Sequence, residues 1–120
     1  MGEPYWYRAK LIRVVDGDAV SLDFDAGFQL WLRGERCRLA GINTPEIFGK
    51  AQPGGAEAKA WLENQIAMCD GDVLVRTEKS KDKFGRWLVW IYPPGSCEPD
   101  KADSLNLQMV RLGLAKAYSS

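Results

Sequence analysis

Three short stretches of this sequence carry the side chains that could do chemistry. The turn DGD (16–18) holds two carboxylates, RLAGINTPE (38–46) holds an arginine, an amide, a hydroxyl and a carboxylate, and DKFGR (82–86) adds a second arginine. Carboxylates are ligands for hard divalent cations, and guanidinium groups bind phosphate oxygens two at a time. In combination, these residue types favour metal-assisted chemistry on a phosphate group.

Each stretch also has a purely structural interpretation, which stays open at this point. DGD and DKFGR are sequences that favour β-turns, Arg38 is compatible with the exposed end of a strand, and Pro45 suits the first turn of a helix. Basic residues gather at 33–38 and 79–86 and acidic residues at 16–25, a distribution that a solvated surface of mixed charge would also give. The elements that position these stretches decide between the two interpretations.

The sequence has no histidine, which removes Ser-His-Asp and Cys-His catalysis from consideration. Proton transfer near neutral pH would fall to a carboxylate, a lysine, a tyrosine or a metal-bound water. The cysteines at positions 37, 69 and 97 are widely spaced and include no CxxC pair, so we expect neither a disulfide framework nor a zinc site. Strand alternation turns Cys37 away from its two arginine neighbours and into the core.

Length and composition predict one globular domain over residues 1–120. Hydrophobic residues make up 46% of the chain and charged residues 27%, both near the average for a globular domain. The 16 basic residues balance the 16 acidic ones, so the net charge gives no sign of a nucleic-acid partner. No apolar run approaches the roughly 20 residues that cross a bilayer. The opening residues lack the apolar centre of a signal peptide, so we expect a location in the cytoplasm, unless a secretion signal has been removed from a precursor. We also expect the protein to be a monomer.

Hydrophobic periodicity and turn residues predict three strands, a helix, two strands and a second helix. The segment 19–24 alternates apolar and polar residues as a half-buried strand does, and DGD joins it to the preceding strand as a hairpin. The third strand contains Gly34, where a bulge or kink would help a sheet to curl. The expected strands are residues 5–15, 19–24, 28–39, 72–78 and 86–92, and the expected helices are residues 56–68 and a helix that begins near Ser104 and is capped by Gly113.

This order of elements predicts the fold class. It lacks the regular alternation of strands and helices that builds a doubly wound sheet. Five strands with a helix between the third and the fourth is the order of an OB-fold barrel, mainly β with two packed helices (α+β), and this fold often binds nucleic acid. The glycine-rich segment 47–55 follows Glu46 directly, and we expect it to form a loop that could act as a flap.

Taken together, five ordered blocks resemble the staphylococcal nuclease (thermonuclease) family. The blocks are VVDGDAV, RLAGINTPE, GGAEAKAWL, DKFGRWLVWIY and LNLQMVRLGLAKAY, and they cover about residues 8–118. Five blocks in the same order are far more specific than any one of them. The resemblance implies an OB-fold barrel and a calcium-dependent phosphodiesterase that acts on DNA and RNA.

The same resemblance assigns roles to individual residues. Asp18, Asn43 and the backbone carbonyl of Thr44 would be the calcium ligands, with Asp16 close by in the same turn. Glu46 would orient or deprotonate the attacking water. The remaining expected site residues are Arg38 and Arg86, which would bind the reacting phosphate, and Lys83 and Tyr118, which would bind a neighbouring phosphate.

Three departures from the family pattern bear on the function. Asn43 stands where the family has a second carboxylate ligand, which keeps an oxygen but removes a negative charge and so weakens the expected hold on calcium. Ala19 replaces a threonine, and Phe84 replaces a tyrosine. Two main function classes therefore stay open: a metal-dependent nuclease, and a catalytically weak or inactive nuclease-like module that binds nucleic acid or a protein partner. A purely structural OB domain is the third alternative.

Overall fold

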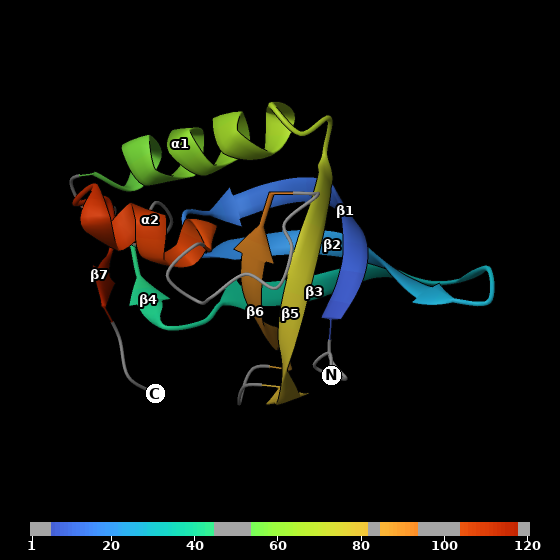
Figure 1. Ribbon diagram of the computed structural model, residues 1–120. Helices are drawn as coiled ribbons and strands as arrows, with labels where there is room; N and C mark the ends of the chain where they lie inside the picture. The colour runs from blue at the N-terminus through green and yellow to red at the C-terminus, as the bar shows by residue number, and fades with distance from the viewer. Residues whose placement is uncertain (1–5, 45–53, 82–84, 94–103, 118–120) are drawn as a thin grey trace.

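The computed structural model describes residues 6–44, 54–81, 85–93 and 104–117. These segments contain seven strands and two helices (Figure 1). In chain order, they are β1 (Trp6–Asp16), β2 (Ala19–Gly27), β3 (Leu30–Leu39), β4 (Ile42–Asn43), α1 (Gly55–Ala67), β5 (Asp72–Lys81), β6 (Trp87–Tyr92), α2 (Leu105–Arg111) and β7 (Lys116–Ala117).

Five of these strands close into a barrel in the order β1-β2-β3-β6-β5. Neighbouring strands are antiparallel except β3 and β6, which run parallel from the pair Cys37 and Trp87 to the pair Leu39 and Val89. In the chain, α1 separates the first three barrel strands from the last two, as in an OB fold. The predicted fold class, a five-stranded OB-fold barrel with two packed helices, is confirmed.

Side chains that alternate along the strands fill the barrel interior. On β2, Val20, Leu22 and Phe24 are all buried, as the apolar and polar alternation of this segment predicts. α1 lies across one end of the barrel (Figure 1), and its Leu62 and Ile66 are fully buried in the same core. The core therefore lies between the barrel wall and the helix that covers one end of it.

β3 carries a bulge at Gly34, as the sequence predicts. The register between β2 and β3 shifts between Leu22 and Phe24, and Gly34 has a φ of 63°. The Asp23 carboxylate accepts hydrogen bonds from Gly34 N at 2.7 Å and from Arg33 Nη1 at 3.0 Å. The hydrogen bond from Gly34 N lowers the pKa of Asp23 below its ordinary value, and the Arg33 guanidinium acts in the same direction. Burial of the carboxyl group raises the pKa and only partly opposes this shift.

Some details of the sequence-based prediction are wrong. β5 runs to Lys81, past the end of the expected strand 72–78. The β2–β3 hairpin turns at Phe28 and Gln29, both with positive φ, although the sequence predicts a turn that ends at Gly27. The reason is that residues other than glycine seldom adopt this conformation, so the turn signal points to the glycine. The helix expected over residues 56–68 ends in the apolar Met68, but this side chain is 77% exposed and follows the end of α1, because the buried positions Ala58, Leu62 and Ile66 have a four-residue spacing that leaves it outside.

A second, two-stranded sheet joins β4 to β7, and the sequence does not predict it. Ile42 pairs with Ala117, and Asn43 pairs with Lys116. Strands of two residues are too short to show a hydrophobic period, which is why pattern analysis misses them. The pairing matters because it holds the backbone of one expected site residue, Asn43.

The second helix follows its prediction closely. Ser104 is the N-cap of α2, and its hydroxyl accepts a hydrogen bond from Leu107 N at 3.2 Å. Gly113 follows the C-terminal end with a φ of 77°, the left-handed conformation that commonly ends a helix. Neither helix in the described part of the chain is long and apolar enough to cross a membrane.

Candidate active site at the end of strand β3

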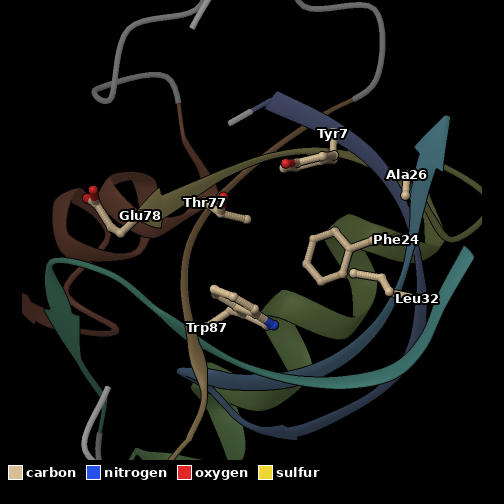
Figure 2. Close-up of a pocket in the computed structure, with 7 residues that line it drawn as sticks. All are labelled: Tyr7, Phe24, Ala26, Leu32, Thr77, Glu78 and Trp87. Carbon is tan, nitrogen blue, oxygen red and sulfur yellow. The ribbon is translucent and has the colours of Figure 1, made fainter. Parts of the chain in front are cut away.

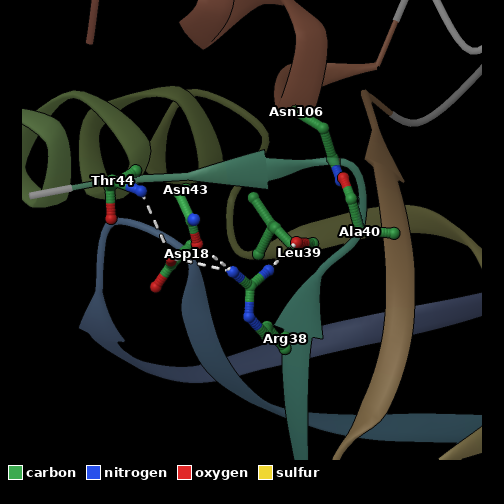
Figure 3. Close-up of polar contacts among 7 residues, drawn as sticks. All are labelled: Asp18, Arg38, Leu39, Ala40, Asn43, Thr44 and Asn106. Atoms are coloured by element: carbon green, nitrogen blue, oxygen red, sulfur yellow. Dashed lines mark hydrogen bonds and ion pairs between the residues drawn. The ribbon is translucent and has the colours of Figure 1, made fainter. Parts of the chain in front are cut away.

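Arg38, near the end of β3, points its guanidinium group at three oxygen acceptors (Figure 3). Its Nη1 donates a hydrogen bond to the carbonyl of Leu39 at 2.7 Å. Its Nη2 donates to Oδ1 of Asn43 and lies 3.6 Å from Oδ2 of Asp18. The side chains of Arg38 and Asp18 are only 14% and 17% exposed, so this ion pair is largely withdrawn from water. The structure thus brings three of the expected site residues into contact.

The DGD turn between β1 and β2 positions Asp18. Its backbone carbonyl accepts from Leu39 N at 2.8 Å, and its Oδ2 accepts from Thr44 N at 3.2 Å. These two bonds tie the turn to both ends of the segment that carries Asn43. The hydroxyl of Thr44 is buried and has no hydrogen-bond partner among the described residues. Leaving a buried hydroxyl unpaired costs free energy, so this position is a point of strain in the described structure.

Gly17 sets how closely the DGD turn approaches its neighbours. A Cβ at this position would lie 2.8 Å from Cβ of Ala58 and 3.0 Å from both Cγ2 and Oγ1 of Thr44. Atoms other than hydrogen do not approach so closely without a shift of the structure, so the position requires glycine. The turn therefore packs against α1 at Gly17, and the carboxylate of the next residue, Asp18, contacts Arg38. The structural and functional interpretations of DGD are compatible.

Asn106 on α2 holds together two backbone segments next to the site, a role that the sequence analysis does not identify. This fully buried side chain donates to the carbonyls of Ala40 at 2.8 Å and Val89 at 2.9 Å, and accepts from Ile91 N at 3.0 Å. Figure 3 shows Asn106 beside Ala40, in the segment that follows Arg38, and the other two bonds connect Asn106 to β6. A signal existed in the sequence, because an amide among the apolar residues of a short helix needs buried partners.

Arg86, the second expected phosphate ligand, is half-buried and directly precedes β6. In the parallel ladder, Trp87 lies opposite Cys37, and Leu88 lies opposite Arg38. The start of β6 therefore runs beside the end of β3. This pairing places Arg38 on β3 and Arg86 just before the start of the neighbouring strand β6.

Three expected site residues, Glu46, Lys83 and Tyr118, lie outside the described residues, as does most of the expected loop at 47–55. Their roles stay predictions. Two described neighbours show how the chain approaches the site: Thr44 bonds to Asp18 just before Glu46, and β7 ends beside β4 just before Tyr118.

The oxygens around Arg38 are of the kind that calcium binds. Asp18 Oδ2 and Asn43 Oδ1 approach the same nitrogen, Nη2 of Arg38. The role expected for the backbone carbonyl of Thr44 stays a prediction, and the hydroxyl of the same residue has no hydrogen-bond partner among the described residues. Calcium takes about six to eight oxygens from carboxylates, carbonyls and water. Within the described residues, no three His, Cys, Asp or Glu side chains form a metal-binding group. The donors fit calcium by type, with a low total charge, and the oxygens of Asp18 and Asn43 are shared with Arg38.

Fold and site together define a class of protein: an OB-fold barrel with arginines and oxygen acceptors beside its third strand. Arginine in such a place suits an anionic ligand such as a phosphate. The chain belongs to the family of staphylococcal nuclease homologues, whose family model matches residues 36–120. The match begins within β3, so it includes Arg38, Asn43 and Thr44, and Asp18 precedes it.

The chain is also similar to individual proteins. The chain is 31% identical over 122 residues to the protein ParB of Escherichia coli, covering 98% of this chain and 62% of that protein. It is 31% identical over 123 residues to the thermonuclease of Staphylococcus intermedius, with 97% and 60% covered. Over 123 residues, it is 28% identical to the endonuclease Htp3 of Saprolegnia parasitica, with 92% and 56% covered. The chain thus spans about three-fifths of the length of these relatives.

Proposed function

We propose that this protein is a metal-dependent phosphodiesterase that hydrolyses DNA, RNA or both, with Ca²⁺ as its cofactor. Membership of the staphylococcal nuclease family supports this function, as does the likeness to proteins named thermonuclease and endonuclease. One observation carries the proposal for this chain: the guanidinium of Arg38 is held, largely buried, between the oxygens of Asp18 and Asn43.

The proposed chemistry requires positive charge around a phosphate. As water attacks in line, negative charge is spread over the equatorial oxygens of the phosphodiester, and fixed cationic groups stabilise this charge. Arg38 and Arg86 bind these oxygens in bidentate geometry, which lysines cannot provide. Glu46 orients or deprotonates the water, and Lys83 and Tyr118 bind a neighbouring phosphate. Calcium, when bound, supplies further positive charge at the reacting phosphate.

Arg38 must exchange partners in this mechanism. Its Nη2 is now bonded to Asn43 and paired with Asp18, which are two of the proposed metal ligands. Two positive groups at the same oxygens repel each other. The oxygens of Asp18 and Asn43 can therefore coordinate a cation only when the guanidinium of Arg38 leaves them and binds the phosphate. The site thus has two arrangements, one closed on Arg38 and one open to a cation and a phosphate.

A second candidate function is a catalytically weak or inactive module that binds nucleic acid or a protein partner. The observation that favours it is the bond from Arg38 to Asn43. An amide at this position leaves Asp18 as the one carboxylate among the proposed ligands, and calcium affinity follows the charge of the ligands. A guanidinium that stays on both residues would keep a cation out.

A cleavage assay separates the two candidates. The purified protein is incubated with labelled single-stranded DNA in millimolar Ca²⁺, in Mn²⁺ and in EDTA, and products are resolved on a denaturing gel. We expect cleavage that requires metal and that falls about a hundredfold or more in Glu46→Gln. The matched control is Glu63→Gln, which removes the same charge from an exposed position on α1 and should cleave like the wild type.

Two outcomes would count against a metal-dependent enzyme. Cleavage that persists in EDTA would exclude the proposed metal dependence. A wild type that binds DNA and leaves it intact in both metals would favour the binding module. In that case, cleavage restored by Asn43→Asp alone would identify the missing carboxylate as the cause.

A further inference from the structure

A cavity of about 290 Å³ lies at the end of the barrel opposite α1. Figure 2 looks into it, with α1 behind the barrel. Each of the five barrel strands contributes to its lining: Tyr7 from β1, Phe24 from β2, Leu32 from β3, Thr77 from β5 and Trp87 from β6. Its volume is near the lower limit, about 300 Å³, of typical small-molecule pockets, so it suits one planar ring system.

Aromatic side chains with defined orientations form much of the lining. The rings of Tyr7 and Phe24 have centroids 6.1 Å apart at an angle of 78°. The indole of Trp87 is oriented by its Nε1, which donates to Oε1 of Glu35 at 3.2 Å. Leu32 is 50% exposed, so apolar surface at this cavity faces water. Such walls favour a flat ring that stacks on an aromatic face and covers the apolar surface.

Positive charge lies beside the cavity along the seam where β3 and β6 run parallel. Trp87, which lines the cavity, directly follows Arg86 in the chain. Nη2 of Arg36 lies 3.8 Å from the position that a Cβ on Gly85 would occupy, so its guanidinium is next to the segment that leads to Trp87. Two residues further along β3 comes Arg38. The three arginines therefore mark a path from the cavity to the proposed active site.

We infer that this cavity binds one unpaired nucleobase of a single-stranded nucleic acid, whose phosphates run along the β3–β6 seam past Arg86 and Arg36 toward Arg38. The inference rests on the proposed function for the class of partner, but it requires binding only and not cleavage. Bases in a duplex are paired and stacked on one another, so only a single strand can insert one. Stacking on aromatic rings tolerates any base, so the expected selectivity is for single strands and not for a sequence.

The test compares a short single-stranded oligodeoxyadenylate with the same strand made abasic, in EDTA so that cleavage does not interfere. Binding is followed by fluorescence anisotropy and by the NMR signals of the Trp87 indole N–H and the Thr77 methyl group. We expect both signals to shift with the base-bearing strand only. Thr77→Phe fills the cavity and should weaken binding of that strand about tenfold, the loss expected for one stacked base, without affecting the abasic strand.

Two variants serve as controls. Met68→Phe adds the same ring at an exposed position just after α1, which covers the opposite end of the barrel, and should bind both strands like the wild type. Arg36→Ala removes a phosphate contact and should weaken both strands equally. If Thr77→Phe does not fold, the NMR shifts of the wild type decide the question.

The inference is overturned if neither NMR signal moves at saturating oligonucleotide, if the wild type binds no oligonucleotide, or if duplex DNA binds as tightly as the single strand. The proposed enzyme fails separately. A strand that shifts both signals but is never cleaved with any cation would leave the base-binding cavity in place and remove the nuclease.

Discussion

The most direct test of the two-arrangement site is the calcium affinity of an Arg38→Met variant. Arg38 and Asp18 are 3.6 Å apart and both largely buried, which corresponds to an attraction of about 4–5 kcal/mol at an effective dielectric constant of about 20. Lost hydration offsets part of this attraction, so the charged contacts of Arg38 contribute a net stabilisation of about 1.5–3 kcal/mol. Calcium must break these contacts to bind, so its binding free energy in the wild type is less favourable by this amount. Arg38→Met should therefore bind Ca²⁺ about tenfold to a hundredfold more tightly, although it should cleave more slowly.

Isothermal titration calorimetry measures this affinity without any reference to activity, and thermal unfolding confirms that the variant is folded. The matched control is Lys10→Met, because Lys10 and Asp72 form an ion pair of the same 3.6 Å length whose side chains are 61% and 52% exposed. Exposed pairs contribute only about 0–1 kcal/mol, so this control should leave the calcium affinity unchanged. Calcium binding by Arg38→Met that equals or falls below that of the wild type would refute the competition. An equal gain in calcium affinity in Lys10→Met would show that the change in net charge, and not the competition between Arg38 and calcium, is the cause.

Three further predictions concern the frame of the site. Gly17→Ala should destabilise the fold by about 1–3 kcal/mol in chemical denaturation, because the new Cβ would lie 2.8 Å from that of Ala58; an unchanged midpoint would contradict this packing. Asn106→Leu should lower the unfolding free energy by at least about 3 kcal/mol, since two carbonyls and one N–H lose their partner, and cleavage should fall with it. Asp23→Asn should be less stable than the wild type at neutral pH. That difference should disappear as the pH falls below about 4, because a carboxyl group with a lowered pKa in the folded state stabilises the fold only while it is ionised; a difference that is independent of pH would refute the role of Gly34 in lowering this pKa.

The sequence predicts the barrel well because its signals are local. Alternation along the second strand places Val20, Leu22 and Phe24 inside, and Gly34 marks the bulge that curls β3. Ser104 marks the start of the second helix, because its hydroxyl caps the first turn. Each of these features depends on residues that are close together in the chain, so a single sequence is sufficient to find them.

The features that the sequence does not predict depend on distant contacts. The pairing of Ile42 with Ala117 joins segments far apart in the chain and leaves no period to detect. The three hydrogen bonds of Asn106 become visible only when α2 lies against β3 and β6. The bonds from Arg38 to Asn43 and Asp18 are of the same kind, since residue types indicate a phosphate site but not that its oxygens are already bonded to one of its own arginines.

The β4–β7 pairing also fixes when the site can form during protein synthesis. A chain leaves the ribosome from its N-terminal end at about 5–20 residues per second, so Asp18 and Arg38 emerge well before the elements that hold their surroundings. Asn106 and Lys116, the residue opposite Asn43, emerge among the last of the described residues. A nascent chain has both charged groups but no frame to hold Asn43 against them. For a protein proposed to cut nucleic acids, the messenger RNA on its own ribosome is then protected from cleavage until the segment that carries β7 has left the ribosome.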